Sequence, residues 1–234
     1  TEATAEFVDG KFRHGTVVRL SKAEEARVLE AYKARESEGL DEKEASDPVL
    51  EYNFEDEKTA QTITDTGKGN TTVWNGTLFG NAKVVYDETV KSNVLQLDGT
   101  DGTYAEIPQG FFDKRNKMTI SMDVKSEKDS GNFFTFTYGQ NSTYYNFLRV
   151  RGTEIRDAIT TTSYSSEQEV KGSGAASGTW QNVVLVVDGT TLKLYVDGSL
   201  VSENTNTQIT TAALGENLLA YLGKSMYSGD AYFK

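Results

Sequence analysis

Cysteine is absent from this 234-residue sequence, and histidine occurs only once, at His14. A chain without cysteine forms no disulfide, binds no zinc through thiolates and has no cysteine nucleophile. One histidine excludes a multi-histidine metal site, and a Ser-His-Asp triad would have to use His14. These two shortages remove several common classes of enzyme and metal protein.

Long hydrophobic runs and clusters of basic residues are also missing. No stretch approaches the ~20 consecutive apolar residues of a membrane-spanning helix. Lys and Arg form no stripe of the kind that nucleic acids or anionic membranes require, and the formal net charge is -11. We therefore expect no nucleic-acid partner and no membrane partner. The acidity fits solubility plus one charged linker, with a cation site as the alternative.

Residues 1–48 read as a separate N-terminal segment that begins extended. The pair Asp9-Gly10 between apolar residues is typical of a hairpin turn. Ser21 and Glu24 form a capping-box pattern, and helix-forming residues continue to Arg35, so a helix is expected there. A charged stretch poor in large apolar residues then predicts an acidic linker. The helix would dock on a neighbouring domain or, alternatively, pack as a connector on the domain that follows.

Short strands and turns dominate the sequence from residue 49 onward. Met118–Val124 alternates strictly, so its four apolar side chains share one face of a strand. Phe134, Phe136 and Tyr138 are likewise expected on one face, with Phe134 and Phe136 in the core. Val183–Val187 is a continuous apolar run, as in a strand buried on both faces.

Two Asp-Gly pairs, Asp188-Gly189 and Asp197-Gly198, flank the alternating run Leu192–Val196. Such pairs are strong hairpin signals, so two consecutive tight hairpins are expected. No helical period competes with the strand pattern beyond residue 48. The sequence therefore predicts an all-β domain, a sandwich or barrel, over residues 49–234.

The order of the strand and turn phrases resembles a known family. The phrases are Leu50–Asp56, Leu95–Pro108, Met118–Val124, Gly178–Gly189 and Leu194–Gly198. Together they are similar to the laminin-G-like, concanavalin A-like jelly roll appended to secreted bacterial glycoside hydrolases. The resemblance implies an antiparallel two-sheet sandwich over 49–234, behind the hairpin, helix and linker of residues 1–48.

The end of the chain departs from the pattern of that family. Its members close with a strand that carries an acidic, arginine and tyrosine phrase, whereas this sequence stops at Tyr232-Phe233-Lys234. Nothing near Thr1 resembles a signal peptide. We therefore expect a sandwich that lacks its closing strand, in a fragment of a larger multidomain protein.

Four oxygen-bearing side chains follow the first predicted strand: Glu55, Asp56, Asp65 and Asn70. Calcium prefers several carboxylate and carbonyl oxygens, and the resemblance implies a structural calcium near this turn. The alternative is that these are ordinary turn residues, because Asp, Asn and Gly favour turns in any case.

Sugar binding is the role that the resemblance implies most directly. Aromatic rings cover the apolar faces of sugars, while Asn, Asp, Arg and Gln bind hydroxyl groups. Tyr145, Arg149, Arg151 and Tyr164 are the candidate ligand-binding residues, because arginine seldom belongs in a sandwich interior. Plain packing or surface exposure is the alternative for each of them.

No catalytic residue is indicated. Catalytic jelly rolls carry a Glu-x-Asp-x-x-Glu strand, and Met122–Glu127 is the nearest phrase but lacks the first carboxylate. We therefore expect a non-catalytic carbohydrate-binding module of a secreted glycan-degrading enzyme, extracellular or on the cell surface of a bacterium, with a glycan and a neighbouring domain of the same polypeptide as partners. The alternatives are a structural spacer that binds no sugar and a complete hydrolase whose carboxylate pair is not visible in the sequence.

Overall fold

A computed structural model describes residues 47–55 and 61–234, and Asp47–Lys234 forms one compact unit. The N-terminal hairpin, the helix and Asp56 lie outside the described residues. The described elements are β1 Thr62–Ile63, β2 Gly76–Phe79, β3 Lys83–Asp87, β4 Ser92–Gln96, β5 Tyr104–Ile107, β6 Lys117–Val124, β7 Phe136–Gly139, β8 Tyr145–Arg151, β9 Glu154–Thr160, η1 Ser163–Ser166, β10 Gln168–Ser173, β11 Gln181–Asp188, β12 Thr191–Val196, β13 Ser199–Asn204, η2 Thr211–Leu214 and β14 Leu219–Leu222. Over these ranges no helix has the length and apolar character needed to cross a membrane.

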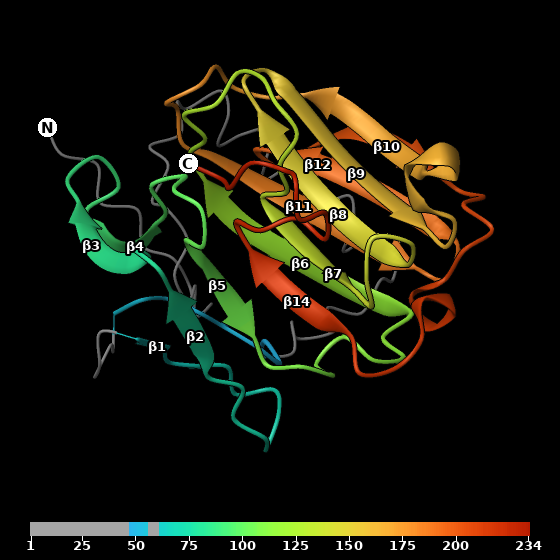
Figure 1. Cartoon of the computed structure of the whole chain (residues 1–234), viewed down its shortest axis with the longest axis horizontal. Coiled ribbons are helices and arrows are strands. Elements are labelled where there is room, and N and C mark those ends of the chain that lie inside the picture. Colours follow the sequence, from blue (N-terminus) through green and yellow to red (C-terminus); the bar gives the residue numbers. More distant parts are fainter. Residues whose placement is uncertain (1–46, 56–60) are drawn as a thin grey trace, which may run out of the picture. The chain divides into compact units, whose positions relative to one another are not determined.

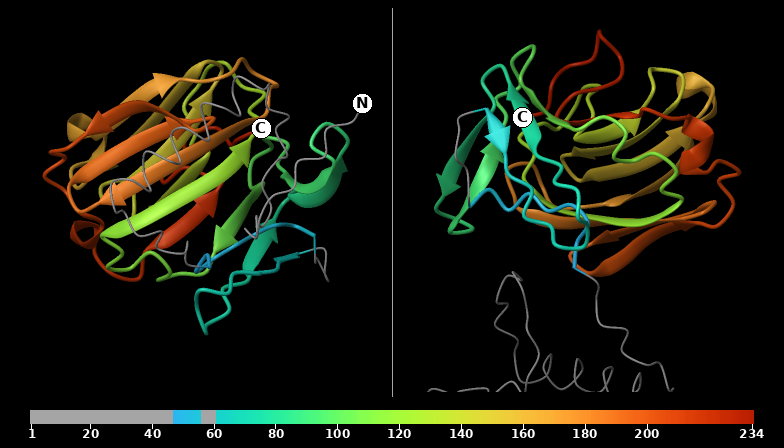
Figure 2. Two further views of the ribbon diagram at one scale, coloured as in Figure 1. Left: turned by 180° about the vertical axis from the view of Figure 1, so that it is seen from behind. Right: turned by 90° about the horizontal axis from the view of Figure 1, so that it is seen from below.

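The strands form an antiparallel sandwich (Figure 1). One sheet has eight strands in the order β1-β2-β5-β14-β7-β8-β9-β10, the second has four in the order β13-β12-β11-β6, and β3 and β4 form a two-stranded ribbon. The two larger layers are seen edge-on in the right panel of Figure 2. This arrangement confirms the all-β antiparallel class expected from the sequence.

The main core lies between the two larger sheets and follows the two-residue period of the strands. In β6, Val124 is buried and Met118, Ile120 and Met122 pack against the core, whereas the residues between them are exposed. The predicted shared face is therefore confirmed. Alternation works here because a strand that contacts a core on one side only needs apolar residues at every second position.

Strand β11 differs from the prediction. Val183, Leu185 and Val187 are buried, but Val184 and Val186 are only partly buried, so the expected burial on both faces is wrong. The reason is that β11 lies inside the four-stranded sheet, where one face meets the core and the other does not.

The two predicted hairpins are confirmed on either side of β12. Asp188 pairs with Thr191, and Val196 pairs with Ser199, which leaves two-residue turns. Asp197 and Gly198 have φ of 46° and 76°. Positive φ at both central residues is the geometry that an Asp-Gly hairpin turn favours.

A second, smaller apolar cluster lies on the opposite, outer face of the eight-stranded sheet. It contains Phe134, Tyr145, Phe147 and Ala158, with Met226 and Tyr227 packed against it. Phe136 and Tyr138 belong to the main core instead, so the prediction that they share a face with Phe134 is wrong. The strand begins only at Phe136, and the two-residue period does not extend back to Phe134.

The C-terminal segment, residues 223–234, crosses this outer face (Figure 1, red). Backbone bonds fix it: Gly223 N–H donates to Thr135 O at 2.9 Å, Phe233 N–H to Gly223 O at 3.0 Å, and Ala231 N–H to Asn132 O at 2.9 Å. The segment thereby covers the second cluster without forming a strand of its own.

Candidate functional site

Three aromatic side chains form a row on the outer face of the eight-stranded sheet. They come from adjacent strands: Phe79 from β2, Tyr104 from β5 and Tyr221 from β14. The Phe79 and Tyr104 rings stack with centroids 4.6 Å apart, and Tyr104 meets Tyr221 edge-on at 5.5 Å. The neighbours Ala105 and Ala220 point into the core, so alternation directs this row outward.

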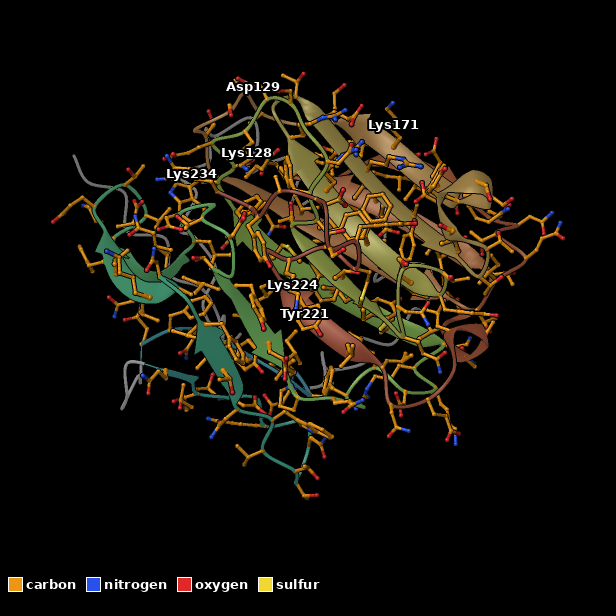
Figure 3. All side chains as sticks on the ribbon, viewed as in Figure 1. Lys128, Asp129, Lys171, Tyr221, Lys224 and Lys234 are labelled. Atoms are coloured by element: carbon orange, nitrogen blue, oxygen red, sulfur yellow. The ribbon has the colours of Figure 1, made fainter. Side chains whose placement is uncertain are left out.

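The ammonium of Lys224 lies over this row, 4.3 Å from the ring centroid of Tyr104 and 4.3 Å from that of Tyr221 (Figure 3). A cation over an aromatic face is attracted by the ring quadrupole. Within the described part of the chain, Lys224 forms no ion pair. Burial lowers the pKa of Lys224, and the charge of Glu106 opposes that shift. Lys224 is thus a half-buried donor that no described carboxylate pairs with.

A small hollow of about 130 Å³ has Lys224 among its lining residues, and we call it the Lys224 pocket. It is lined by Lys224, Ser225, Met226, Tyr227, Ser228, Asp230 and Tyr232. The Ser225 hydroxyl donates to the Asp230 carboxylate at 2.6 Å and accepts from Tyr227 N–H at 3.0 Å. The Asp230 carboxylate is therefore held in place. The pocket combines a cationic donor, an oriented anionic acceptor, hydroxyl groups and aromatic walls.

The wall residue Tyr227 is held by Tyr145 and Ser163. The Tyr227 hydroxyl lies 2.7 Å from the Ser163 hydroxyl and 3.2 Å from the Tyr145 hydroxyl. Tyr145 donates to Glu167 at 2.5 Å and is 0% exposed. The expected surface position of Tyr145 is therefore wrong, because the C-terminal segment covers it. Burial raises the pKa of Tyr145, so its hydroxyl stays protonated.

Arg149 and Arg151 lie on the outer face, as expected for arginine, but both are paired. Their guanidinium groups bind one oxygen of Glu154 at 2.8 Å and 2.7 Å, and Lys171 binds the other oxygen at 3.2 Å. Burial alone would raise the pKa of Glu154, but the bonds from Arg149 and Lys171 and the charge of Arg151 lower it to about 2. Glu154 therefore stays ionised and forms ion pairs with both arginines.

Tyr164 is the most exposed of the predicted ligand-binding residues, with 76% of its surface open. It lies in the short η1 turn, and its ring centroid is 6.5 Å from that of Tyr227. Tyr164 therefore stands beside the Lys224 pocket and is free to contact a ligand there. Whether any of the four predicted residues binds a sugar stays a prediction.

The predicted calcium ligands that the structure describes act in turns. Asp65 accepts from Glu51 N–H at 3.1 Å, Gly67 N–H at 2.9 Å and Trp74 N–H at 2.9 Å. Asn70 accepts from Thr72 N–H at 3.2 Å.

Glu55, the other described member of that set, reaches β4, where it accepts from Asn93 N–H at 3.0 Å and from Ser92 Oγ at 2.6 Å. Across residues 47–55 and 61–234, no group of three or more His, Asp or Glu side chains is placed to hold a metal ion. Calcium binding at this turn stays a prediction of the resemblance.

A buried carboxyl group, Asp157 of β9, lies on the inner side of the same sheet. It is 0% exposed, and one oxygen accepts from the Asn146 amide at 3.1 Å. The second oxygen of Asp157 and the side-chain oxygen of Asn146 have no hydrogen-bond partner among residues 47–55 and 61–234. Burial raises the pKa of Asp157 from an ordinary 3.8 to about 8, against the smaller effects of Asn146 and Arg156. This acid faces the core and lines neither the Lys224 pocket nor its aromatic row, so it affects the pH dependence of stability and not the site.

The sequence did not single out Lys224, Tyr104 or Tyr221 as site residues. Alternation could have placed Tyr104 and Glu106 on one face of a strand. It could not have shown that β14 pairs with β5, because that pairing joins segments more than a hundred residues apart.

Comparisons with known proteins agree with this fold. The Concanavalin A-like lectin/glucanases superfamily matches residues 98–234. An alpha-L-arabinofuranosidase of Bifidobacterium longum subsp. longum is 30% identical over 210 residues, which is 81% of this chain and 19% of the relative. The chain thus spans about a fifth of the length of that enzyme.

Two solved structures share the fold. One is domain 4 of AbnA, a GH43 extracellular arabinanase from Geobacillus stearothermophilus in complex with arabinotriose, with a TM-score of 0.52 and 19% identity over 68% of this chain and 77% of that one. The other is the binding domain of botulinum neurotoxin serotype D, with a TM-score of 0.58 and 14% identity over 80% of this chain and 46% of that one. The family match covers more than half of the sequence, and the sandwich is the one it implies: the chain belongs to the Concanavalin A-like lectin/glucanases superfamily.

Proposed function

We propose that this chain is a non-catalytic carbohydrate-binding module of a larger extracellular bacterial enzyme that degrades glycans, and that the sugar binds at the Lys224 pocket. One observation carries the proposal. A half-buried ammonium that forms no ion pair with the described residues lies over the rings of Tyr104 and Tyr221, and Lys224 itself lines a hollow that also holds an oriented carboxylate.

The chemistry of this arrangement suits a neutral sugar. A sugar ring presents apolar C–H faces and a rim of hydroxyl groups, each of which can donate and accept. The Lys224 ammonium can donate to a hydroxyl oxygen, the Asp230 carboxylate can accept from a hydroxyl, and the rings of Tyr227 and Tyr232 can cover an apolar face. Ligand pockets commonly combine apolar walls with a few fixed polar groups in this way.

Similarity to arabinan-acting enzymes supports arabinose-containing glycans as the ligand class. The Bifidobacterium relative is an alpha-L-arabinofuranosidase, and the Geobacillus domain was solved with arabinotriose. Because the chain spans only a fifth of the former, catalysis would belong to another part of the parent protein. Tethering by a binding module raises the local concentration of the polymer for such a catalytic domain.

The carboxylates near the pocket favour binding over hydrolysis. Glycoside hydrolases normally need two carboxyl groups on either side of the scissile bond. Asp230 is the single carboxylate that lines the Lys224 pocket. The ordered bond from Ser225 gives it the role of a hydroxyl acceptor.

Titration with arabinotriose followed by calorimetry tests the proposal. Lys224→Met keeps the aliphatic stem over the rings and removes the charge, and Asp230→Asn keeps the shape and removes the anion. Each should weaken binding about tenfold, the value of one charge-assisted hydrogen bond. Thr119→Ala, on the exposed face of β6, is the matched control. Binding unchanged in both pocket variants would contradict the site, and no binding of any glycan would favour a structural spacer.

A further inference from the structure

A larger groove lies beside the turn between β2 and β3. Its volume is about 530 Å³, and it is lined by Gln61, Leu78, Gly80, Asn81, Ala82, Lys83, Gln96 and Asp98. Leu78 and Ala82 are buried and belong to the core, so the groove has an apolar floor. Its rim consists of amide, carboxylate and ammonium groups. We call it the Asn81 groove.

Two of the polar residues are fixed in place by hydrogen bonds. The Asn81 amide donates to the Asp98 carboxylate at 2.8 Å, and Thr100 N–H donates to the other oxygen of Asp98 at 2.9 Å. These bonds lower the pKa of Asp98 to about 2, and the bond from Thr100 has the largest effect. The groove therefore holds an ionised acceptor at every pH near neutrality, and its position is set before any ligand arrives.

The side chains of three other polar residues in the groove are free of bonds to the described part of the chain. The side chains of Gln61, Gln96 and Lys83 form no hydrogen bond or ion pair, either with one another or elsewhere in the described chain. Each amide offers two donors and a carbonyl acceptor. Side chains of this kind on an apolar floor match the surface of a neutral sugar. Lys83 and Asp98 give the groove one charge of each sign, so its net charge selects neither an anion nor a cation.

Short contacts link the Asn81 groove to the Lys224 pocket. A Cβ on Gly99, next to Asp98, would lie 3.1 Å from the Lys234 Cβ and 3.6 Å from the carbonyl oxygen of Tyr232, a residue that lines the pocket. On the sheet itself, the Tyr104 ring stacks on Phe79 at 4.6 Å and lies 6.3 Å from the Tyr232 ring.

Phe79 is also next to the groove in the sequence. It is 37% exposed and directly precedes Gly80 and Asn81 of the groove. A chain of neighbours therefore leads from one hollow to the other. It runs from Lys224 over the Tyr104 ring to Phe79, and from Phe79 into the β2–β3 turn.

We propose that the Asn81 groove is a second subsite for the same glycan, so that the module binds an extended, neutral oligosaccharide chain across two hollows. The inference rests on the proposed function of the Lys224 pocket. A linear chain of several sugars is the ligand class that it specifies, because a single sugar would not extend from one hollow to the other.

The test compares ligand lengths in two variants. Wild-type protein is titrated with arabinose, arabinotriose and longer linear arabino-oligosaccharides. Affinity should rise with length in the wild type. The double variant Gln61→Ala/Gln96→Ala should bind the longest chain about tenfold more weakly, as expected for one or two lost hydrogen bonds, and should bind the shortest ligand as the wild type does.

The control is Thr119→Ala. Equal melting temperatures should show that the double variant folds, because neither glutamine side chain bonds to any described residue. Lys224→Met should weaken binding at all lengths. Unchanged affinity of the double variant for the longest chain would overturn the second subsite while leaving the proposed function intact. Absence of binding by the wild-type protein at every length would instead overturn the proposed function and, with it, the subsite.

Discussion

The hydroxyl groups of Tyr145 and Tyr227 lie 3.2 Å apart, and this contact joins the buried second cluster to the wall of the Lys224 pocket. Tyr145 comes from β8 of the sheet, and Tyr227 comes from the C-terminal segment that crosses it. Their rings meet edge-on with centroids 5.7 Å apart. A residue with no exposed surface therefore fixes the position of a residue that can contact a ligand.

Tyr145→Phe tests this relationship. It keeps the ring and removes the hydroxyl that contacts Glu167 and Tyr227. We expect a loss of about 1–2 kcal/mol in the free energy of unfolding and several-fold weaker sugar binding, because the pocket wall loosens. Urea denaturation and calorimetry measure the two effects. Stability that falls while affinity stays equal would show that Tyr227 needs no support from Tyr145.

Glu154→Gln tests whether Arg149 and Arg151 serve the fold. Glu154 binds both guanidinium groups and Lys171, and the side chain of Arg149 is only 12% exposed. Removing the charge should cost about 1–2 kcal/mol of stability and leave sugar affinity unchanged.

The pKa of Glu154 gives this stabilisation a pH dependence. Because the folded-state pKa is depressed to about 2, the stabilisation is present above the ordinary pKa near 4.5 and is lost as pH falls toward 2. An equal loss of sugar affinity in Glu154→Gln would point to arginine contacts with the ligand, as the sequence predicted.

Asp157 gives stability the opposite dependence on pH. Its pKa is raised from 3.8 to about 8 by burial, so between these values the unfolded chain is ionised while the folded protein keeps the proton. The contribution of Asp157 to stability should therefore be highest below about pH 4, decline toward pH 8 and be level above it. Besides Asn146, the ionisable groups that act on this carboxyl are Arg156 and Tyr138; the hydroxyl of Tyr138, whose pKa burial raises, stays neutral.

Asp157→Asn isolates that contribution, because the amide resembles the neutral acid. In the wild type, the free energy of unfolding should fall by about 1.4 kcal/mol per pH unit in this range because of Asp157. The variant should lack this fall, and at pH 8 it should be more stable than the wild type. Urea denaturation at several pH values measures the difference. The same slope in both proteins would contradict a buried, neutral Asp157.

The calcium prediction has a direct test in thermal melting. A calcium ion bound at Glu55, Asp56, Asp65 and Asn70 would raise Tm in proportion to its binding free energy, and chelation would reverse the rise. Asp65→Asn would abolish the response. Equal Tm values with calcium and with chelator would contradict the calcium site. Asp65 and Asn70 would then act only in turns, through their hydrogen bonds to backbone N–H groups.

Local patterns in the sequence predicted most of the fold. The alternation of Met118–Val124 and the two Asp-Gly turns are visible without any knowledge of partners, because they depend on the two-residue period and on turn geometry. The errors at Phe134 and Val184 came from assuming that a pattern extends beyond the strand or applies to both faces.

The candidate site could not be predicted in the same way. Lys224, Tyr104 and Tyr221 meet because β14 inserts between β5 and β7, a pairing that no local signal specifies. The sequence predicted Tyr145, like Arg149 and Arg151, to be a surface residue. Its burial depends on the C-terminal segment, whose path is set by backbone bonds from Gly223, Ala231 and Phe233.

The most direct test of the central claim is an NMR titration of the backbone amides with arabinotriose. Binding at the Lys224 pocket predicts that the amide shifts of residues 224–232 and of Tyr104 change together with increasing ligand, while those of β6 and β11 stay constant. Shifts confined to the four-stranded sheet, or none at millimolar ligand, would contradict the claim that this pocket binds a sugar.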